Sequence, residues 1–326
     1  MSRTKKVNWM FLGLLLFYIA GSFGISYLNL KNPVPEVILD TLGEILIIIP
    51  IFLYLIVTKE KPEKLIQHEP MHPINYLFII ILAYLSMPLM SILNIFSTQV
   101  SENYVSDMLM NMMRNPFAYN LVIVAILPCL VEEFVFRGIL FHSYREKGIL
   151  KAAFVSGLLF GLLHLNLNQF SYGFVLGVIF ALLVEATGTI WSSILFHFIV
   201  NTHSLILSTI FAYSPLFQNM EQELVGEQEV DMLTEAILES SGYWIVSVAI
   251  TILMAAGTTA LGVMLYKYLA KRCERWEHIK QVLKGQDKKS LLEENTEPKK
   301  KIFEILDIPL LLAIGICLFF LFYPLK

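Results

Sequence analysis

Residues 117–144 have the sequence FAYNLVIVAILPCLVEEFVFRGILFHSY, and this stretch decides the class of the fold. It is a long apolar run that is interrupted near its centre by Glu132, Glu133 and Arg137. About 20 apolar residues are needed for a helix to cross the hydrocarbon core of a bilayer, and this run is long enough. Charged side chains are costly at that depth and are kept mainly for a task. The stretch therefore indicates a membrane helix that carries a polar site.

The rest of the chain repeats this apolar pattern. Of the 326 residues, 56% are hydrophobic and 16% are charged, whereas soluble domains carry roughly 25% charged residues. Nine runs are long enough to span a bilayer, near residues 7–28, 36–58, 74–97, 117–144, 150–168, 170–186, 189–213, 243–269 and 303–324. A β-barrel would need short alternating segments instead. We predict an all-α bundle of eight or nine transmembrane helices, a multi-pass protein of the cell membrane.

The basic residues predict the orientation of this bundle. If the N-terminus is cytoplasmic, the external segments hold only Lys31, Arg114 and Lys326, as the positive-inside rule expects. Basic residues precede the first run as in a signal peptide, but no small-residue cleavage site follows, so we interpret it as an uncleaved span. The net charge of −3 gives no indication of nucleic-acid binding, and the three scattered cysteines predict no disulfide framework.

Four regions follow from this arrangement of spans. We predict three N-terminal spans and an interfacial helix, a helical core, an acidic external loop, and C-terminal spans with a charged cytoplasmic linker at 271–302. Their bounds are 1–116, 117–213, 214–242 and 243–326. The linker could extend the eighth helix into solvent. Glu185 and Asp307 lie near cytoplasmic ends, where we expect them to reach water.

Three short motifs place polar side chains on three of the predicted spans. They are Glu132-Glu133-x-x-x-Arg137, Phe160-x-x-x-His164 and His197-x-x-x-Asn201. Residues four apart share one face of a helix, whereas adjacent residues point about 100° apart. Counting about 1.5 Å of rise per residue from each cytoplasmic end brings all three motifs to a similar depth. The spacing therefore predicts one polar site between helices.

The chemistry that these residues support is limited. The predicted spans contain no HExxH, GxGD or GxSG motif, and no serine or cysteine in them stands out as a nucleophile. A carboxylate and imidazoles remain, and these can activate water as general bases. A further His and an Asn could donate hydrogen bonds to a developing oxyanion. Alternatively, Glu132, His164 and His197 could hold Zn²⁺ with an open position for water.

These residues resemble a known family. The segments EEFVFR, FGLLH and HFIVN match the three motifs of the CPBP/Abi family of intramembrane proteases, over about residues 117–213. That family includes the type II CAAX prenyl endopeptidases and the lysostaphin-resistance-like proteins. Three motifs in order, each on a predicted span, are fairly specific.

The resemblance implies a role for each motif residue. Glu132 would activate water with the help of His164, while His197 and Asn201 would stabilise the oxyanion. The supporting residues Glu133 and Arg137 would orient the site through a buried ion pair. The resemblance leaves open whether a metal takes part.

Together, these observations predict an intramembrane endopeptidase that acts on a peptide or membrane-protein substrate within or beside the bilayer. One alternative is a transporter or ion-coupled carrier that uses the same buried cluster as a relay. Another is a non-catalytic scaffold or bacteriocin-immunity protein that works by binding.

Overall fold

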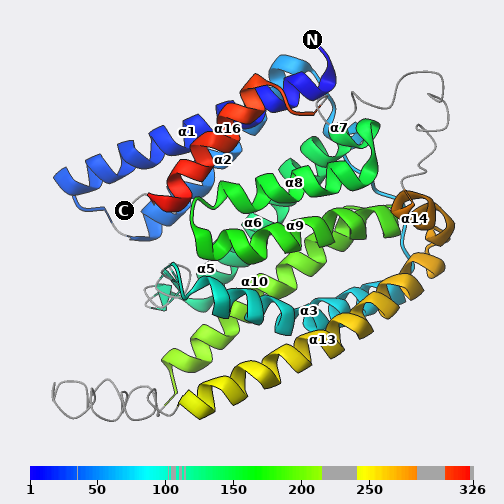
Figure 1. Ribbon diagram of the computed structural model, residues 1–326. Helices are drawn as coiled ribbons and strands as arrows, with labels where there is room; N and C mark the ends of the chain where they lie inside the picture. Colours follow the sequence, from blue (N-terminus) through cyan, green and yellow to red (C-terminus); the bar gives the residue numbers. More distant parts are fainter. Residues whose placement is uncertain are drawn as a thin grey trace.

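Long helices joined by short turns make up the described part of the chain (Figure 1). The structure, a computed structural model, describes residues 1–34, 36–101, 103, 108–109, 112–113, 115–214, 241–284 and 305–323. Within these ranges the backbone forms helices and turns, with one isolated β-bridge between His68 and Thr189. The prediction of an all-α bundle is confirmed.

Each predicted span coincides with helical structure. The single helices are α1 (Arg3–Lys31), α2 (Glu36–Thr58), α3 (Pro73–Ser97), α8 (Ile149–Leu163), α9 (Leu167–Thr187), α10 (Trp191–Ala212), α13 (Ser241–Arg272) and α16 (Ile308–Phe322). Among the described residues, six helices are long and apolar enough to cross a membrane, while α8 and α16 are shorter apolar helices. The chain is therefore a multi-pass membrane protein. The number of crossings and the side of the N-terminus stay predictions.

Residues 117–144 are helical throughout, but the type of helix changes along them. The stretch comprises α5 (Phe117–Asn120), η2 (Leu121–Ile126), α6 (Leu127–Glu133), η3 (Phe134–Phe141) and α7 (His142–Tyr144), and the short η4 (Arg145–Lys147) follows it. Segments η2 and η3 are π-helical, and they flank the α-helical segment α6, which ends at Glu133. Such π turns are rare and occur frequently at functional sites. The sequence pattern predicted a helix here, not its two π segments.

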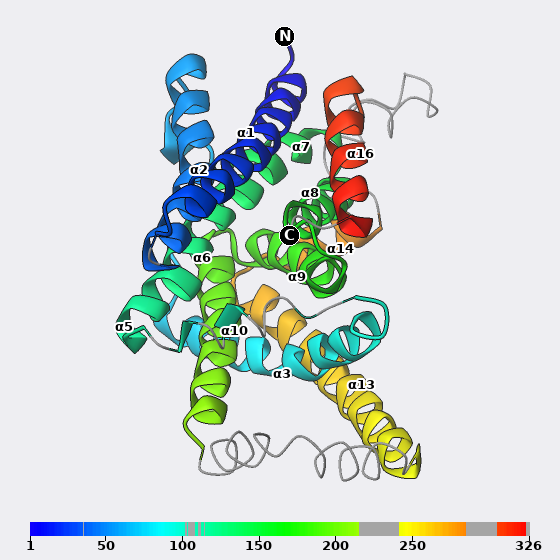
Figure 2. The same cartoon turned by 90° about the vertical axis from the view of Figure 1, so that its left-hand side faces the viewer.

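The helices form a bundle in which α8 and α9 lie between two groups (Figures 1 and 2). Helices α1, α2 and α16 lie on one side, and α3 and α13 lie side by side on the other. Helix α10 contacts α9 on one side and α6 and η2 on another, and it also contacts α3. It therefore joins the α8–α9 pair to the 117–144 stretch. This contact positions the third motif beside the first.

Glycines allow α8 and α9 to approach closely. A Cβ atom on Gly157 would lie 2.7 Å from the backbone nitrogen of Val178, and one on Gly177 would lie 2.7 Å from the Cα of Gly157. Real Cβ atoms do not approach other atoms so closely, so only glycine fits at either position. Gly161 on α8 and Gly173 on α9 each lie four residues from one of these glycines, a spacing that is typical of tightly packed membrane helices.

The turn between these helices begins earlier than predicted. Helix α8 ends at Leu163, not near residue 168, and His164 is its C-cap residue. Leu165 then has a positive φ of 54°, and the Asn166 side chain accepts a hydrogen bond from the backbone N–H of Gln169 at 2.8 Å to cap α9. The conformation of Leu165 ends the helix despite the continuing apolar run.

The linker after α13 does not extend that helix as expected. Glu274 has a positive φ of 57°, and a separate helix, α14 (Trp276–Leu283), then folds back to contact α8 and α9. Some predictions concern residues outside the described ranges. They are those for residues 215–240 of the acidic loop, for residues 285–302 of the linker and for most of the interfacial helix predicted at 102–114.

Candidate active site

Glu133 lies at the centre of a buried polar cluster. Its side chain is 0% exposed, and its Oε1 atom accepts hydrogen bonds from Arg137 Nη1 at 3.0 Å and from His197 Nδ1 at 3.1 Å. Arg137 lies one helical turn further along the same stretch, whereas His197 comes from α10. The first and third motifs therefore meet at one carboxylate oxygen.

Arg137 is enclosed by groups that accept or balance its charge. Its Nη2 donates to the carbonyl oxygen of Gly177 at 3.0 Å, and its guanidinium carbon lies 4.5 Å from the ring centroid of Phe160 and 4.9 Å from that of Phe180. A buried charge is tolerated only when it is paired and its donors are used. Arg137 meets most of that condition, because Nη1 pairs with a carboxylate, Nη2 donates to a backbone carbonyl and two aromatic faces contact the guanidinium, while Nε is buried without a hydrogen-bond partner.

Glu132 differs from its neighbour in exposure and in partner. Its side chain is 15% exposed, and its Oε2 lies 3.8 Å from His197 Nε2, which is too long for a direct hydrogen bond. His197 therefore stands between two carboxylates, with Nδ1 on Glu133 and Nε2 facing Glu132. The order is a partly exposed carboxylate, an imidazole, a buried carboxylate and a buried guanidinium.

His164 is held by the helix that it terminates. Its Nδ1 lies 2.9 Å from the carbonyl oxygen of Phe160, and because a carbonyl can only accept, Nδ1 carries the proton. The Nε2 of the neutral ring is then left as the acceptor. The ring of Phe160 packs edge-on against both imidazoles, with centroids 5.3 Å from His164 and 5.7 Å from His197. The second motif thus joins the cluster through Phe160.

Asn201 lies one turn beyond His197 on α10. Its Nδ2 donates to the carbonyl oxygen of Val124 in the π-helical segment η2 at 3.0 Å. An amide nitrogen carries two hydrogens, so a second donor remains on Asn201 beyond this bond.

The possible zinc site is not assembled in this arrangement. Within the described residues, no three His, Cys, Asp or Glu side chains converge closely enough to hold one metal ion. The bond from His197 Nδ1 to Glu133 is one that metal-bound histidines also make, so only the separation of the three side chains counts against the site. In this arrangement Glu132, His164 and His197 therefore do not fit a three-ligand zinc site.

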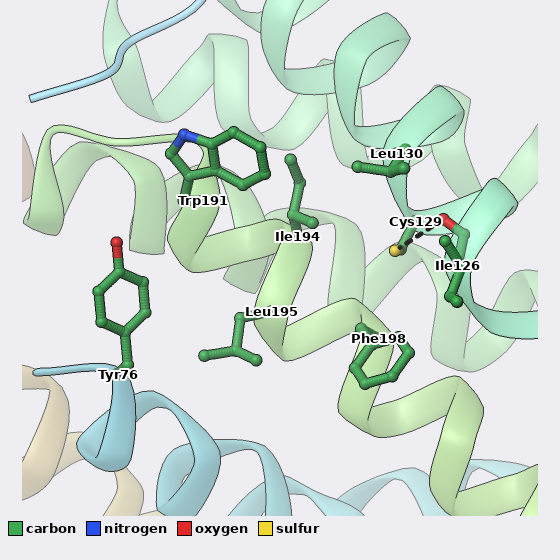
Figure 3. Close-up of a pocket in the computed structure, with 8 residues that line it drawn as sticks. All are labelled: Tyr76, Ile126, Cys129, Leu130, Trp191, Ile194, Leu195 and Phe198. Carbon is green, nitrogen blue, oxygen red and sulfur yellow. Dashed lines mark hydrogen bonds between the residues drawn. The ribbon is translucent and has the colours of Figure 1, made fainter. Parts of the chain in front are cut away.

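An apolar pocket of about 340 Å³ lies beside the cluster (Figure 3). Its lining comes from α3, α10 and the η2–α6 stretch and consists of Tyr76, Ile126, Cys129, Leu130, Trp191, Ile194, Leu195 and Phe198. None of the motif residues lines it. The thiol of Cys129 donates to the carbonyl oxygen of Ile126 at 3.1 Å, and the lining contains no carboxylate or imidazole.

Glu185 is a second buried carboxylate, and the sequence pattern did not predict its burial. Glu185 was expected to reach water, but its side chain is 0% exposed. Its Oε1 lies 3.0 Å from Arg145 Nη2, 3.2 Å from Arg275 Nη2 and 2.6 Å from His278 Nε2. These partners are 40, 90 and 93 residues away in the chain, so no local spacing could have indicated them.

Comparisons with known proteins match the segment that carries this cluster. The model of the type II CAAX prenyl endopeptidase Rce1-like family matches residues 114–203. The Bacillus subtilis (strain 168) protein named "Putative membrane peptidase YdiL" is 29% identical over 104 residues. That alignment covers 32% of this chain and 41% of the relative, so the chain spans about two fifths of the relative's length. No solved structure matches the chain significantly. The chain is therefore a multi-pass membrane protein whose residues 114–203 are similar to the type II CAAX prenyl endopeptidase Rce1-like family, within the CPBP/Abi group that the three motifs resemble.

Proposed function

We propose that this protein is an intramembrane endopeptidase in which Glu132 activates the water that attacks a peptide carbonyl. The observation that carries the proposal is the position of His197 between Glu132 and the buried Glu133–Arg137 pair. A structural ion pair alone would need no second, partly exposed carboxylate on the other side of the imidazole. The matched family and the name of the bacterial relative support peptide hydrolysis as the reaction class.

In the proposed reaction, Glu132 takes a proton from water as the oxygen forms a bond to the carbonyl carbon. The carbonyl π electrons move to oxygen, giving a tetrahedral oxyanion. Collapse of this intermediate breaks the C–N bond, and the proton held by Glu132 passes to the leaving amine. His164, with Nε2 as its acceptor, assists the removal of the proton from water. No covalent intermediate is required.

The oxyanion would be stabilised by donors from α10. Asn201 offers its second amide hydrogen, and His197 can donate from Nε2 when its ring carries both protons. Donors that are fixed before the reaction typically supply several kcal/mol of transition-state stabilisation. Glu133 and Arg137 would serve this step indirectly, because they hold the other edge of His197 in place.

The substrate proposed is a membrane-associated peptide or a membrane protein. The polar cluster lies among helices long and apolar enough to cross a bilayer, so the scissile bond must reach it within or beside the lipid. The description of the matched family names prenyl substrates, and the proposal for this chain does not include prenylation.

Comparative membrane proteomics tests the proposal. Cells that produce the wild type are compared with cells that produce Glu132→Gln, and with a matched Glu146→Gln control on the exposed turn that ends the same helical stretch. We expect a set of peptide termini that appears with the wild type and the control and is absent with Glu132→Gln. Identical termini in all three strains would contradict the proposal. Ion or proton flux in proteoliposomes without peptide cleavage would favour the carrier alternative.

A further inference from the structure

Phe180 belongs to none of the three motifs, yet it contacts the side chains at their meeting point. It comes from α9, which carries no motif residue, and its side chain is 0% exposed. Its ring stacks on the imidazole of His197 with a centroid distance of 5.2 Å and an interplanar angle of 29°. The same ring lies 4.9 Å from the guanidinium carbon of Arg137.

A second aromatic ring contacts the same imidazole and guanidinium from another direction. Phe160 packs edge-on to His197 at 88° and lies 4.5 Å from the guanidinium carbon of Arg137. The two rings are themselves in edge contact, with centroids 6.1 Å apart. The imidazole and the guanidinium are therefore both held between Phe160, contributed by α8, and Phe180, contributed by α9.

Hydrogen bonds alone do not fix the imidazole in its observed plane. His197 has one short polar contact, from Nδ1 to Glu133, about which the ring can turn, and the 3.8 Å separation from Glu132 is too long to restrain Nε2. Stacking on Phe180 supplies the missing restraint, because an aromatic face favours one ring orientation. Without it, Nε2 could swing away from Glu132 while the bond to Glu133 persisted.

We propose that Phe180 is a positioning residue for the reaction: its ring keeps His197 aligned between Glu132 and Glu133 and keeps Arg137 on Glu133. This inference rests on the proposed function. It adds a residue that the family motifs do not contain, and it explains why α9 must lie close to the 117–144 stretch. Phe180 does not touch the substrate in this proposal, so it affects the rate of the chemical step and not substrate binding.

Steady-state kinetics of three variants on one cleaved peptide test the inference. Phe180→Leu removes the aromatic face at similar bulk, and Phe180→Tyr keeps it. Phe174→Leu is the matched control, because Phe174 lies on the same helix but its ring packs on Phe154 and Phe170, away from the cluster. We expect Phe180→Leu to lower kcat about tenfold with KM within about twofold, since an aromatic or cation–π contact is of that size. Phe180→Tyr should recover most of the rate, and Phe174→Leu should match the wild type.

A double-mutant cycle separates positioning from a general loss of packing. If Phe180 acts through the Arg137–Glu133–His197 group, combining Phe180→Leu with Arg137→Lys should lower kcat by less than the product of the two single effects. Phe174→Leu with Arg137→Lys should be multiplicative. Phe180→Met, whose flexible side chain fills irregular space, replaces Phe180→Leu if the leucine variant does not fold.

The outcomes distinguish this inference from the proposed function. An active wild type with equal kcat values for Phe180→Leu and Phe174→Leu would overturn the role of Phe180 alone, as would a change confined to KM. A wild type that cleaves nothing, when Glu132→Gln behaves identically, would overturn the proposed function and this inference with it.

Discussion

Two buried carboxylates in this protein have nearly the same partners but different surroundings. Glu133 and Glu185 are both 0% exposed, and each uses Oε1 to bind arginine and histidine side chains. The partners of Glu133 are 0% and 6% exposed, whereas those of Glu185 are 25–34% exposed. The first cluster is closed on all sides, and the second lies where three segments meet at the end of the bundle.

The partners of each histidine explain the difference. His197 uses one ring nitrogen on Glu133 and turns the other toward a second carboxylate, Glu132. His278 directs its Nε2 to Glu185, as do two arginines from separate segments. In the proposed function the first arrangement moves a proton between groups. The second joins the end of the 117–144 stretch to α9 and α14, and we assign it a structural role.

The largest effect is expected at Glu132. Replacing it with Gln should lower kcat by about 10³-fold, because a general base contributes roughly 10²–10⁴-fold. Its side chain is partly exposed and is not part of the closed ion pair, so thermal unfolding in detergent should change little. Turnover of purified wild type and variant on one peptide measures the effect. An unfolding midpoint that falls together with kcat would assign Glu132 to structure.

Replacing one arginine in each cluster should show the largest difference between the two clusters in the free energy of unfolding. Arg137→Met leaves Glu133 buried without its guanidinium and should cost about 3–5 kcal/mol. Arg145→Met should cost no more than about 1 kcal/mol, because Arg145 is partly exposed and Glu185 keeps two other cations. Chemical denaturation of both variants in the same detergent gives the comparison. Equal losses of unfolding free energy would mean that the difference in solvent exposure between the two clusters does not affect stability.

Glu185→Gln should loosen α14 with little effect on cleavage. The charge that holds Arg275 and His278 is lost, while the Glu132–His197–Glu133 geometry is untouched. We expect faster proteolysis within residues 274–284 under limited trypsin treatment and a kcat within about threefold of the wild type. A loss of activity as large as that of Glu132→Gln would show that the second cluster also serves catalysis.

The smallest effect is expected from metal chelation. Because no three possible metal ligands converge among the described residues, cleavage should stay within about twofold after treatment with EDTA or 1,10-phenanthroline. Activity assays before and after dialysis against each chelator measure this. Loss of activity that Zn²⁺ restores would mean that these side chains rearrange around a metal.

Local spacing was enough to predict part of this structure. The Glu133–Arg137 pair followed from two residues four apart in an apolar run, and the helical spans followed from run length. Features that depend on distant residues did not follow. The burial of Glu185, the contact of Phe180 with His197 and the fold-back of α14 all depend on which helices pack together. The π-helical segments and the early end of α8 depend on backbone geometry that the apolar pattern does not encode. The four predicted regions and the catalytic roles stay predictions.

Hydrolysis in ¹⁸O-labelled water tests the central claim most directly. Wild-type protein in proteoliposomes should release a peptide whose new C-terminal carboxylate carries one ¹⁸O atom, because the attacking oxygen comes from water. Glu132→Gln should yield no labelled product over the same period, while Glu146→Gln yields as much as the wild type. Labelled product from Glu132→Gln at the wild-type rate would contradict the claim that Glu132 activates this water.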